Sequence, residues 1–280
     1  MRSRSQPWLL ALFALLTVAP LAAGILYALA YSLGLTGLLN TGFTLAHWQA
    51  VLGAGVFWQA LWFSAAQAVG AISLALALAL VVVLWRPGAF QTGLLSFAIY
   101  LPLTLPAIVV AFLAFQGLSK SGLLSRIAYA LGFIGGLEQF PDLVNDPAGI
   151  GILLAHAGMA TPFFILLLTQ LYEQERVAAY ADLAATLGAT RRQRILKVQT
   201  PLLLRRAFPT VVLYALFVMS AYEIPLLLGS QSRPMVTVLA VEKLQRYNLA
   251  DIPQAYTISV LYSVVVIGAT LWLLGRQKTQ

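Results

Sequence analysis

Six long apolar stretches limit what this 280-residue chain can fold into. A membrane-spanning helix needs about 20 predominantly apolar residues, because each residue adds about 1.5 Å and the hydrocarbon core is about 30 Å thick. The stretches that meet this length are residues 7–33, 57–84, 93–118, 148–172, 208–228 and 253–274. The sequence therefore predicts an all-α, polytopic membrane protein with six transmembrane helices, forming a single domain over residues 1–280.

Composition agrees with this fold and argues against several kinds of chemistry. Hydrophobic residues make up 60% of the chain and charged residues 9%, whereas about 25% of residues in a soluble domain are charged. The chain has no cysteine and only two histidines, His47 and His156. Disulfides, thiolate metal sites and multi-histidine metal centres are therefore poor hypotheses, and we expect neither a metal nor a cofactor.

Membrane topology explains the net charge of +8 better than nucleic-acid binding does. Lys and Arg in short loops stay on the cytoplasmic side of a membrane. If the N-terminus is cytoplasmic, most basic residues fall on that side, and both termini are cytoplasmic. The cytoplasmic set is Arg2, Arg4, Arg86, Arg176, Arg191, Arg192, Arg194, Lys197, Arg205, Arg206, Arg276 and Lys278, and the outer set is Lys120, Arg126, Arg233, Lys243 and Arg246. We expect the first stretch to be an uncleaved span, because it is too long for the core of a signal peptide.

Two outer loops carry patterns of their own. Residues 43–52 have apolar side chains near helical spacing, which predicts a short interfacial helix before the second span. Residues 120–147 contain Glu138, Asp142 and Asp146. We interpret this segment as a solvated loop, with a funnel for cations as the alternative.

Helix breakers interrupt the third, fourth and fifth stretches. Pro102 and Pro106 lie one helical turn apart, and each removes a backbone N–H and crowds the carbonyl four residues earlier, so we expect a kink. Broken helices are tolerated in membranes where they face protein or a water-filled cavity. These three spans are therefore predicted to line a conduit, with lining candidates Pro102, Pro106, His156, Tyr222, Glu223 and Pro225.

Glu223 and His156 each allow two interpretations. An ionisable group inside a membrane is costly and is a functional candidate by default. Glu223 could line the pathway, or it could lie hydrated in the outer headgroup layer. His156 could line the pathway with Thr161 as a hydrogen-bonding neighbour, but packing between helices is favoured.

Residues 173–206 form a long, basic, amphipathic segment between the fourth and fifth spans. Apolar spacing predicts helices over 174–187 and 190–198, joined at Gly188, because glycine reaches backbone conformations that cost other residues. Thr190 is a candidate N-cap, and Pro201 is expected to end the second helix. An amphipathic helix lying on anionic lipid is the alternative interpretation of this segment.

This segment resembles the cytoplasmic signature loop in permease subunits of bacterial binding-protein-dependent ABC importers. That signature is Glu-Ala-Ala, then a glycine, then an Ile or Val shortly before Leu-Pro. The matching positions here are Asp182, Leu183, Ala184, Gly188, Val198 and Pro201. The chain departs from the pattern in having Asp182 for Glu, Leu183 for the first Ala and Thr200 for the Leu before proline.

The resemblance implies a type I ABC importer permease fold, a place in the bacterial inner membrane, and a coupling loop over residues 173–206 that docks on an ATPase. It also implies specific partners: ABC ATPase subunits, a second permease chain that is identical or different, and an extracytoplasmic solute-binding protein. The chain itself would not be an enzyme. It contains no Gly-x-x-x-x-Gly-Lys-Ser/Thr loop, so nucleotide must bind to a partner.

Within the family, residues 221–230 and 234–239 look most similar to the spermidine/putrescine-type branch, which also includes permeases for ferric iron, sulfate, thiamine and phosphonates. The expected cargo is therefore polyamine-like, and Glu223 with Tyr222 would suit a cation. The main alternative is a stand-alone ion-coupled secondary transporter, which needs coupling carboxylates near the bilayer midplane. An intramembrane enzyme would need a convergent nucleophile and base, and the sequence offers none.

Overall fold

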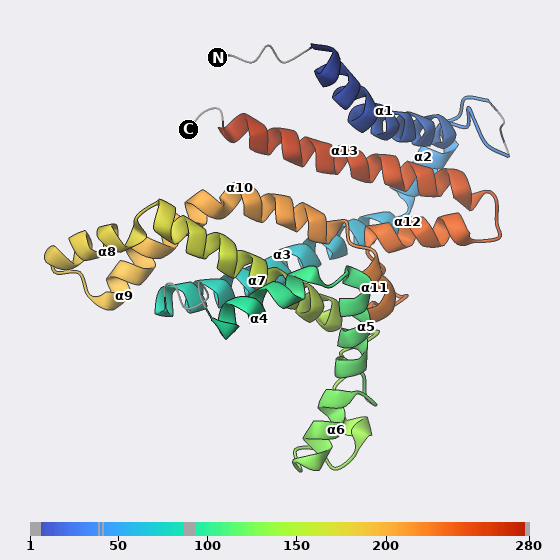
Figure 1. Cartoon of the computed structure of the whole chain (residues 1–280). Coiled ribbons are helices and arrows are strands. Elements are labelled where there is room, and N and C mark those ends of the chain that lie inside the picture. Colours follow the sequence, from blue (N-terminus) through green and yellow to red (C-terminus); the bar gives the residue numbers. More distant parts are fainter. Residues whose placement is uncertain (1–6, 39, 41, 87–92, 278–280) are drawn as a thin grey trace. The chain divides into compact units, whose positions relative to one another are not determined.

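The computed structural model describes residues 7–38, 40, 42–86 and 93–277. Arg2, Arg4 and Lys278 of the topology argument lie outside these residues. The described part is helical and contains no strand, apart from one isolated bridge between Asp146 and Gly229. In order, the elements are α1 (Pro7–Ser32), α2 (Ala46–Gly53), α3 (Gly55–Trp85), α4 (Leu94–Thr104), α5 (Ala107–Leu118), α6 (Leu123–Ala130), the 3-10 helix η1 (Leu137–Gln139), α7 (Ile150–Gln174), α8 (Val177–Thr186), α9 (Arg191–Gln193), the π-helix η2 (Arg194–Gln199), α10 (Thr200–Met219), α11 (Glu223–Leu228), α12 (Val236–Gln245) and α13 (Asp251–Gln277) (Figure 1).

Among the described residues, six helical segments are long and apolar enough to cross a membrane, which confirms the predicted fold class. They are Ala11–Ser32, Gly55–Trp85, Ala107–Ala130, Ile150–Gln174, Arg191–Met219 and Asp251–Leu273. The short helix expected over residues 43–52 is also present, as α2. The third and fifth segments differ from their predicted bounds.

The third stretch is broken rather than kinked. Leu105 is extended, with ψ of 129°, and Pro106 precedes the first residue of α5. A residue before proline is pushed away from helical backbone angles, so α4 ends there. Pro102 lies inside α4 without ending it. The third membrane-spanning segment therefore comprises α5 and α6, Ala107–Ala130, and does not include α4.

The fifth stretch begins and ends earlier than predicted. α10 spans Thr200–Met219, and the backbone leaves the helix at Ser220–Tyr222 before α11 begins. Pro225 is the third residue of α11, where the N–H that proline lacks would have no partner within the helix. The predicted span over 208–228 was therefore two helices with a break between them.

The chain divides into two compact units, Met1–Ala60 with Val236–Gln280, and Leu61–Met235. In the first unit, α13 packs against α1, α2 and α12 (Figure 1). The rings of Tyr31 and Tyr256 join α1 to α13, with centroids 4.5 Å apart. The predicted single domain over residues 1–280 stays a prediction.

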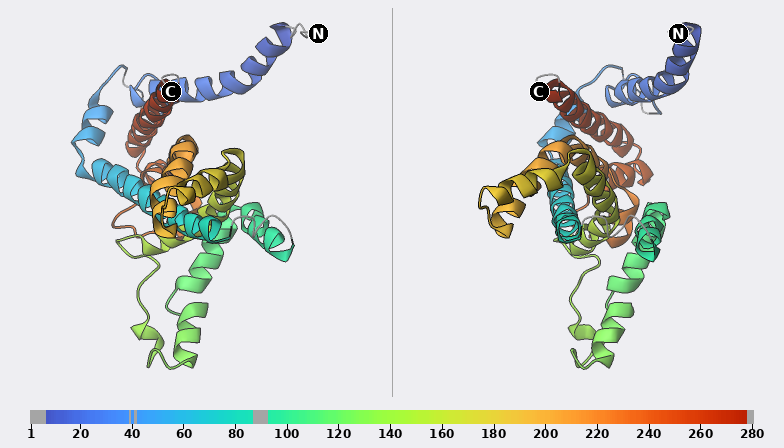
Figure 2. Two further views of the ribbon diagram at one scale, coloured as in Figure 1. Left: turned by 90° about the vertical axis from the view of Figure 1, so that its left-hand side faces the viewer. Right: turned by 60° about the vertical axis from the view of Figure 1, so that its left-hand side comes forward.

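The second unit is built around α7, which packs against α4, α5, α8, α10 and α11. A buried cluster of Ala111, Ile152, Ala155, Ile224, Leu228 and Met235 joins α5, α7 and α11. Figure 2 shows two extensions from this core: α6 continues beyond α5, and α8 lies beside η2.

Candidate functional site

The predicted corner at Gly188 is present and has a defined geometry. Gly188 has φ of +85°, a left-handed conformation that glycine reaches without steric cost. Its N–H donates to the Ala185 carbonyl, and the Ala189 N–H donates to the Ala184 carbonyl, both at 3.0 Å. These two bonds form a Schellman motif, which satisfies the free carbonyls at the end of α8.

The helix after the corner begins where the sequence predicts. Thr190 is its N-cap: the Thr190 hydroxyl accepts from the Gln193 N–H, and the Gln193 side chain accepts from the Thr190 N–H at 2.9 Å. This reciprocal capping box satisfies two backbone donors at the helix start. The corner and the cap together fix a sharp reversal of the chain between α8 and α9.

The prediction that Pro201 ends this helix was wrong. The backbone passes from α9 through η2 into α10 without leaving a helical conformation. The Thr200 N–H donates to the Ile195 carbonyl, five residues back, and Pro201 has no N–H to continue that ladder. Wider π-helical turns therefore precede the proline, and α-helical turns follow it.

The signature residues lie along the hairpin made by α8, α9 and η2, except Pro201, which is the second residue of α10. Asp182, Leu183, Gly188 and Pro201 are exposed, whereas Ala184 and Val198 are half-buried. The ion pair between Glu175, which follows α7, and Arg206 of α10, at 3.1 Å, joins the two segments that flank the hairpin. The hairpin therefore has a packed inner side and an open outer side.

The apolar side chains of α8 and of Leu187, which follows it, are divided between these two sides. Val177 and Ala181 are buried. Tyr180, Leu183 and Leu187 are exposed at helical spacing, and the Leu187 side chain at the corner is 82% exposed. Contiguous apolar surface left open on a protein marks an interaction site. The hairpin thus offers an apolar edge and a tight, small-residue corner.

The pathway candidates come from helices that pack together, but their side chains have different environments. His156 is buried in α7, and no described group bonds to its Nε2 atom. The Thr161 hydroxyl bonds to the Ala157 carbonyl at 2.7 Å, which accounts for Thr161 without His156. Pro102 is half-buried and Pro106 is exposed. Whether they line a pathway stays a prediction.

Glu223 begins α11 and is exposed, while Tyr222 before it is half-buried. Pro225 is buried, together with Ile224 and Leu228, on the face that packs on the core. The fold therefore holds α11 by its apolar face and leaves the Glu223 carboxylate on the open side.

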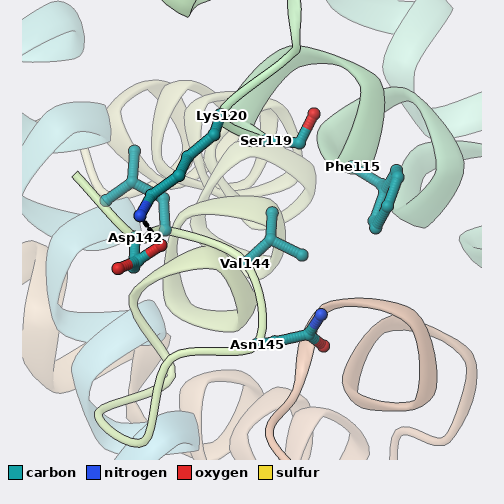
Figure 3. Close-up of a pocket in the computed structure, with 7 residues that line it drawn as sticks. Phe115, Ser119, Lys120, Asp142, Val144 and Asn145 are labelled. Carbon is teal, nitrogen blue, oxygen red and sulfur yellow. Dashed lines mark ion pairs between the residues drawn. The ribbon is translucent and has the colours of Figure 1, made fainter. Parts of the chain in front are cut away.

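The outer loop predicted to be solvated is ordered in part. Asp142 is exposed and pairs with Lys120 at 2.8 Å (Figure 3), but Asp146 is buried. The solvated interpretation is therefore wrong for Asp146, because the N-terminus of α7 supplies a hydrogen bond that sequence spacing does not reveal. The ion pair borders a hollow of about 180 Å³, which is smaller than usual for small-molecule sites. Its lining is Phe115, Ser119, Lys120, Asp142, Leu143, Val144 and Asn145.

These features define a polytopic α-helical membrane protein with an ordered, exposed hairpin between two spans. The chain belongs to the family described as binding-protein-dependent transport system inner membrane component, which matches residues 83–276. It is therefore a permease subunit of an ABC importer with the type I fold, a transport subunit rather than an enzyme, in the inner membrane. The family assignment sets aside the stand-alone secondary transporter.

Two solved structures share the fold. One is a bacterial ABC transporter involved in import of the acidic polysaccharide alginate, with a TM-score of 0.69, 15% identity, and coverage of 97% of this chain and 96% of that chain. The other is a bacterial alginate ABC transporter in complex with an alginate pentasaccharide-bound periplasmic protein, with a TM-score of 0.65, 14% identity, and coverage of 96% and 91%. No curated protein is similar enough in sequence to count as a relative.

Proposed function

We propose that the hairpin of α8, α9 and η2 is the coupling element through which a partner ATPase drives this permease. The observation that carries the proposal is the exposed apolar edge of Tyr180, Leu183 and Leu187, which ends at the left-handed corner of Gly188. A glycine corner permits close approach of another protein. A short helix attached to long packed helices transmits motion as a rigid lever.

The assembly that fits this role has ATPase subunits on the cytoplasmic side, a second permease chain, and a solute-binding protein outside. Both termini are then cytoplasmic. The many Lys and Arg residues around the hairpin support this orientation. The complex of a similar permease with a periplasmic protein supports a binding protein as the source of cargo, and the family description supports it too.

The test of this proposal is co-purification from solubilised native membranes, with partners identified by mass spectrometry. The native chain should recover an ATP-binding subunit, and Leu187→Asp should lose it, because a charge at the docking edge is costly to bury. Phe133→Asp is the matched control, since Phe133 is similarly exposed, at 78%, in a loop predicted to lie outside. Equal ATPase recovery with Leu187→Asp and the native chain would refute the docking role of the hairpin.

For the cargo, we propose a small cation of the polyamine type, with Glu223 facing the pathway. Two observations support this choice: the exposed carboxylate at the start of α11, and the similarity of residues 221–230 and 234–239 to the spermidine/putrescine branch. The two structurally similar transporters carry alginate, an acidic polysaccharide. A carboxylate in the pathway would repel such a cargo, so an acidic sugar is the alternative that must be tested. The test that separates the cationic from the acidic cargo uses proteoliposomes that contain this chain and its partner subunits. It compares their uptake of labelled spermidine with their uptake of an alginate oligosaccharide. Uptake of the acidic sugar alone would refute the cationic cargo.

A further inference from the structure

The loop before α7 is bonded directly to the end of α11. The Asn145 N–H donates to the Leu228 carbonyl at 2.8 Å, and Asp146 forms a parallel bridge with Gly229. Asn145 makes this bond in a left-handed conformation, with φ of +58°, which most residues adopt only at a cost. Segments more than eighty residues apart in sequence are therefore joined by main-chain contacts.

Asp146 ties this junction to α7. Its carboxylate is buried, with 6% of the residue exposed, and both oxygens lie 3.0 Å from the Ile150 N–H at the first turn of α7. Its carbonyl accepts from the Gly149 N–H at 3.2 Å. A carboxylate at a helix N-terminus is stabilised by free N–H groups and by the helix dipole. One side chain thus fixes where α7 begins beside the end of α11.

Close packing leaves this junction little room to move. A Cβ atom added to Gly151 would collide with the Leu143 carbonyl, and one added to Gly229 would collide with the Pro225 carbonyl. On the α3 side, the Gln67 amide donates to the Ala148 carbonyl at 2.7 Å. We name this junction, formed by residues 143–151 with Leu228 and Gly229, the Asp146 clasp.

The clasp continues into the apolar core below it. Ile152 of α7 and Leu228 of α11 are both fully buried and belong to one cluster with Ala111 of α5. The core holds the buried face of α11, and the clasp holds its last residues. Glu223 lies on the first turn of the same short helix, so its place depends on both.

We propose that Asp146 is a positioning residue for transport: it holds residues 143–151 and α11 as one rigid body, so that Glu223 keeps a fixed place while the permease alternates. The clasp itself rests on the hydrogen bonds and packing above. Its consequence for cargo rests on the proposed pathway role of Glu223. The exchange and uptake measurements below therefore test the two parts separately.

The structural test is hydrogen exchange on the full chain in lipid nanodiscs with its ATPase. In the native protein, peptides from residues 143–152 and 223–230 should be protected, with and without ATP. Asp146→Ala removes the carboxylate that accepts from the Ile150 N–H, and exchange in both peptides should rise about tenfold, the size expected for losing a hydrogen bond to a charged group. Asp146→Asn keeps one acceptor oxygen and should give a smaller rise, which keeps the test usable if Asp146→Ala does not fold.

Asp142→Asn is the matched control, because it makes the same chemical change four residues away at the exposed pair with Lys120 (Figure 3). Exchange in both peptides should be unchanged in this variant. Faster exchange in residues 143–152 alone after Asp146→Ala would overturn the proposal, since the clasp would not hold α11. Protection that is lost on ATP addition to the native protein would overturn it as well.

The transport test is uptake kinetics with labelled spermidine. If the clasp positions Glu223, Asp146→Ala should raise KM for uptake about tenfold, while the ATPase rate without cargo is unchanged and Asp146→Asn partly restores KM. An equal loss of the uptake rate and of the ATPase rate without cargo would indicate a merely structural role for Asp146 and would overturn the positioning role. If Asp146→Ala raises exchange in both peptides but leaves KM unchanged, the clasp is supported and the pathway role of Glu223 is rejected. Failure of the coupling hairpin is distinguishable, because it abolishes ATP-driven uptake without altering exchange at the clasp.

Discussion

Replacing Gly188 by alanine tests the corner of the hairpin through backbone conformation alone. Nothing lies within 4 Å of a Cβ atom added there, but φ is +85°. The cost is therefore that of holding an L-residue in the left-handed region, about 1–2 kcal/mol. A cost of this size raises the fraction of molecules with an open corner about 5- to 30-fold. Exchange at the Gly188 and Ala189 amides, which close the Schellman motif, should rise by that factor.

Two further variants complete this prediction. Gly158→Ala is the matched control: Gly158 lies inside α7, also has no atom within 4 Å of an added Cβ, and has a helical backbone, so it should stabilise the protein by about 0.5–1 kcal/mol. Gly188→Pro cannot adopt the positive φ and lacks the N–H, so the protein should reach the membrane yet lose ATP-driven uptake. Unchanged exchange and uptake in both Gly188 variants would refute the argument that the corner geometry matters.

Three further predictions concern the hairpin and the pathway. Thr190→Ala should destabilise the start of α9 by about 1 kcal/mol, seen as faster exchange at Gln193, and no change there would contradict the capping box. Pro201→Ala supplies an N–H to the ladder before α10, so the π-helical turns of η2 should convert to α-helical turns, which backbone chemical shifts would report; unchanged shifts would show that the proline is not their cause. Glu223→Gln should lower uptake of spermidine but not that of an anion, and equal spermidine uptake by variant and native protein would remove Glu223 from the pathway.

The helical class and the number of spans were predictable because lipid leaves few solutions. Backbone polar groups in hydrocarbon must be satisfied within helices, so apolar runs of sufficient length become spans. The corner at Gly188 and the cap at Thr190 were predictable for a similar reason, since both depend on local backbone chemistry.

The departures all depend on partners that are distant in sequence or on backbone adjustments. The sequence predicts an interrupted helix at Pro106 and at Pro201 alike. At Pro106 the preceding residue is extended and the helix ends, whereas at Pro201 the π-helical turns of η2 keep the chain helical. Asp146 resembles any loop carboxylate until the fold places it over the first turn of α7. Its role depends on Leu228 and Gly229, which no local pattern connects to it.

Docking of the ATPase on the hairpin can be measured by thiol labelling, because the chain has no native cysteine. Leu187→Cys places a single thiol at the exposed corner, and Phe133→Cys places one at a similarly exposed residue in the loop predicted to lie on the other side of the membrane. The measurement is the rate of maleimide labelling of each variant with and without the partner ATPase. We expect the ATPase to protect the thiol of Leu187→Cys and to leave the labelling rate of Phe133→Cys unchanged. Equal labelling of Leu187→Cys in the presence and absence of bound ATPase would contradict docking on the hairpin.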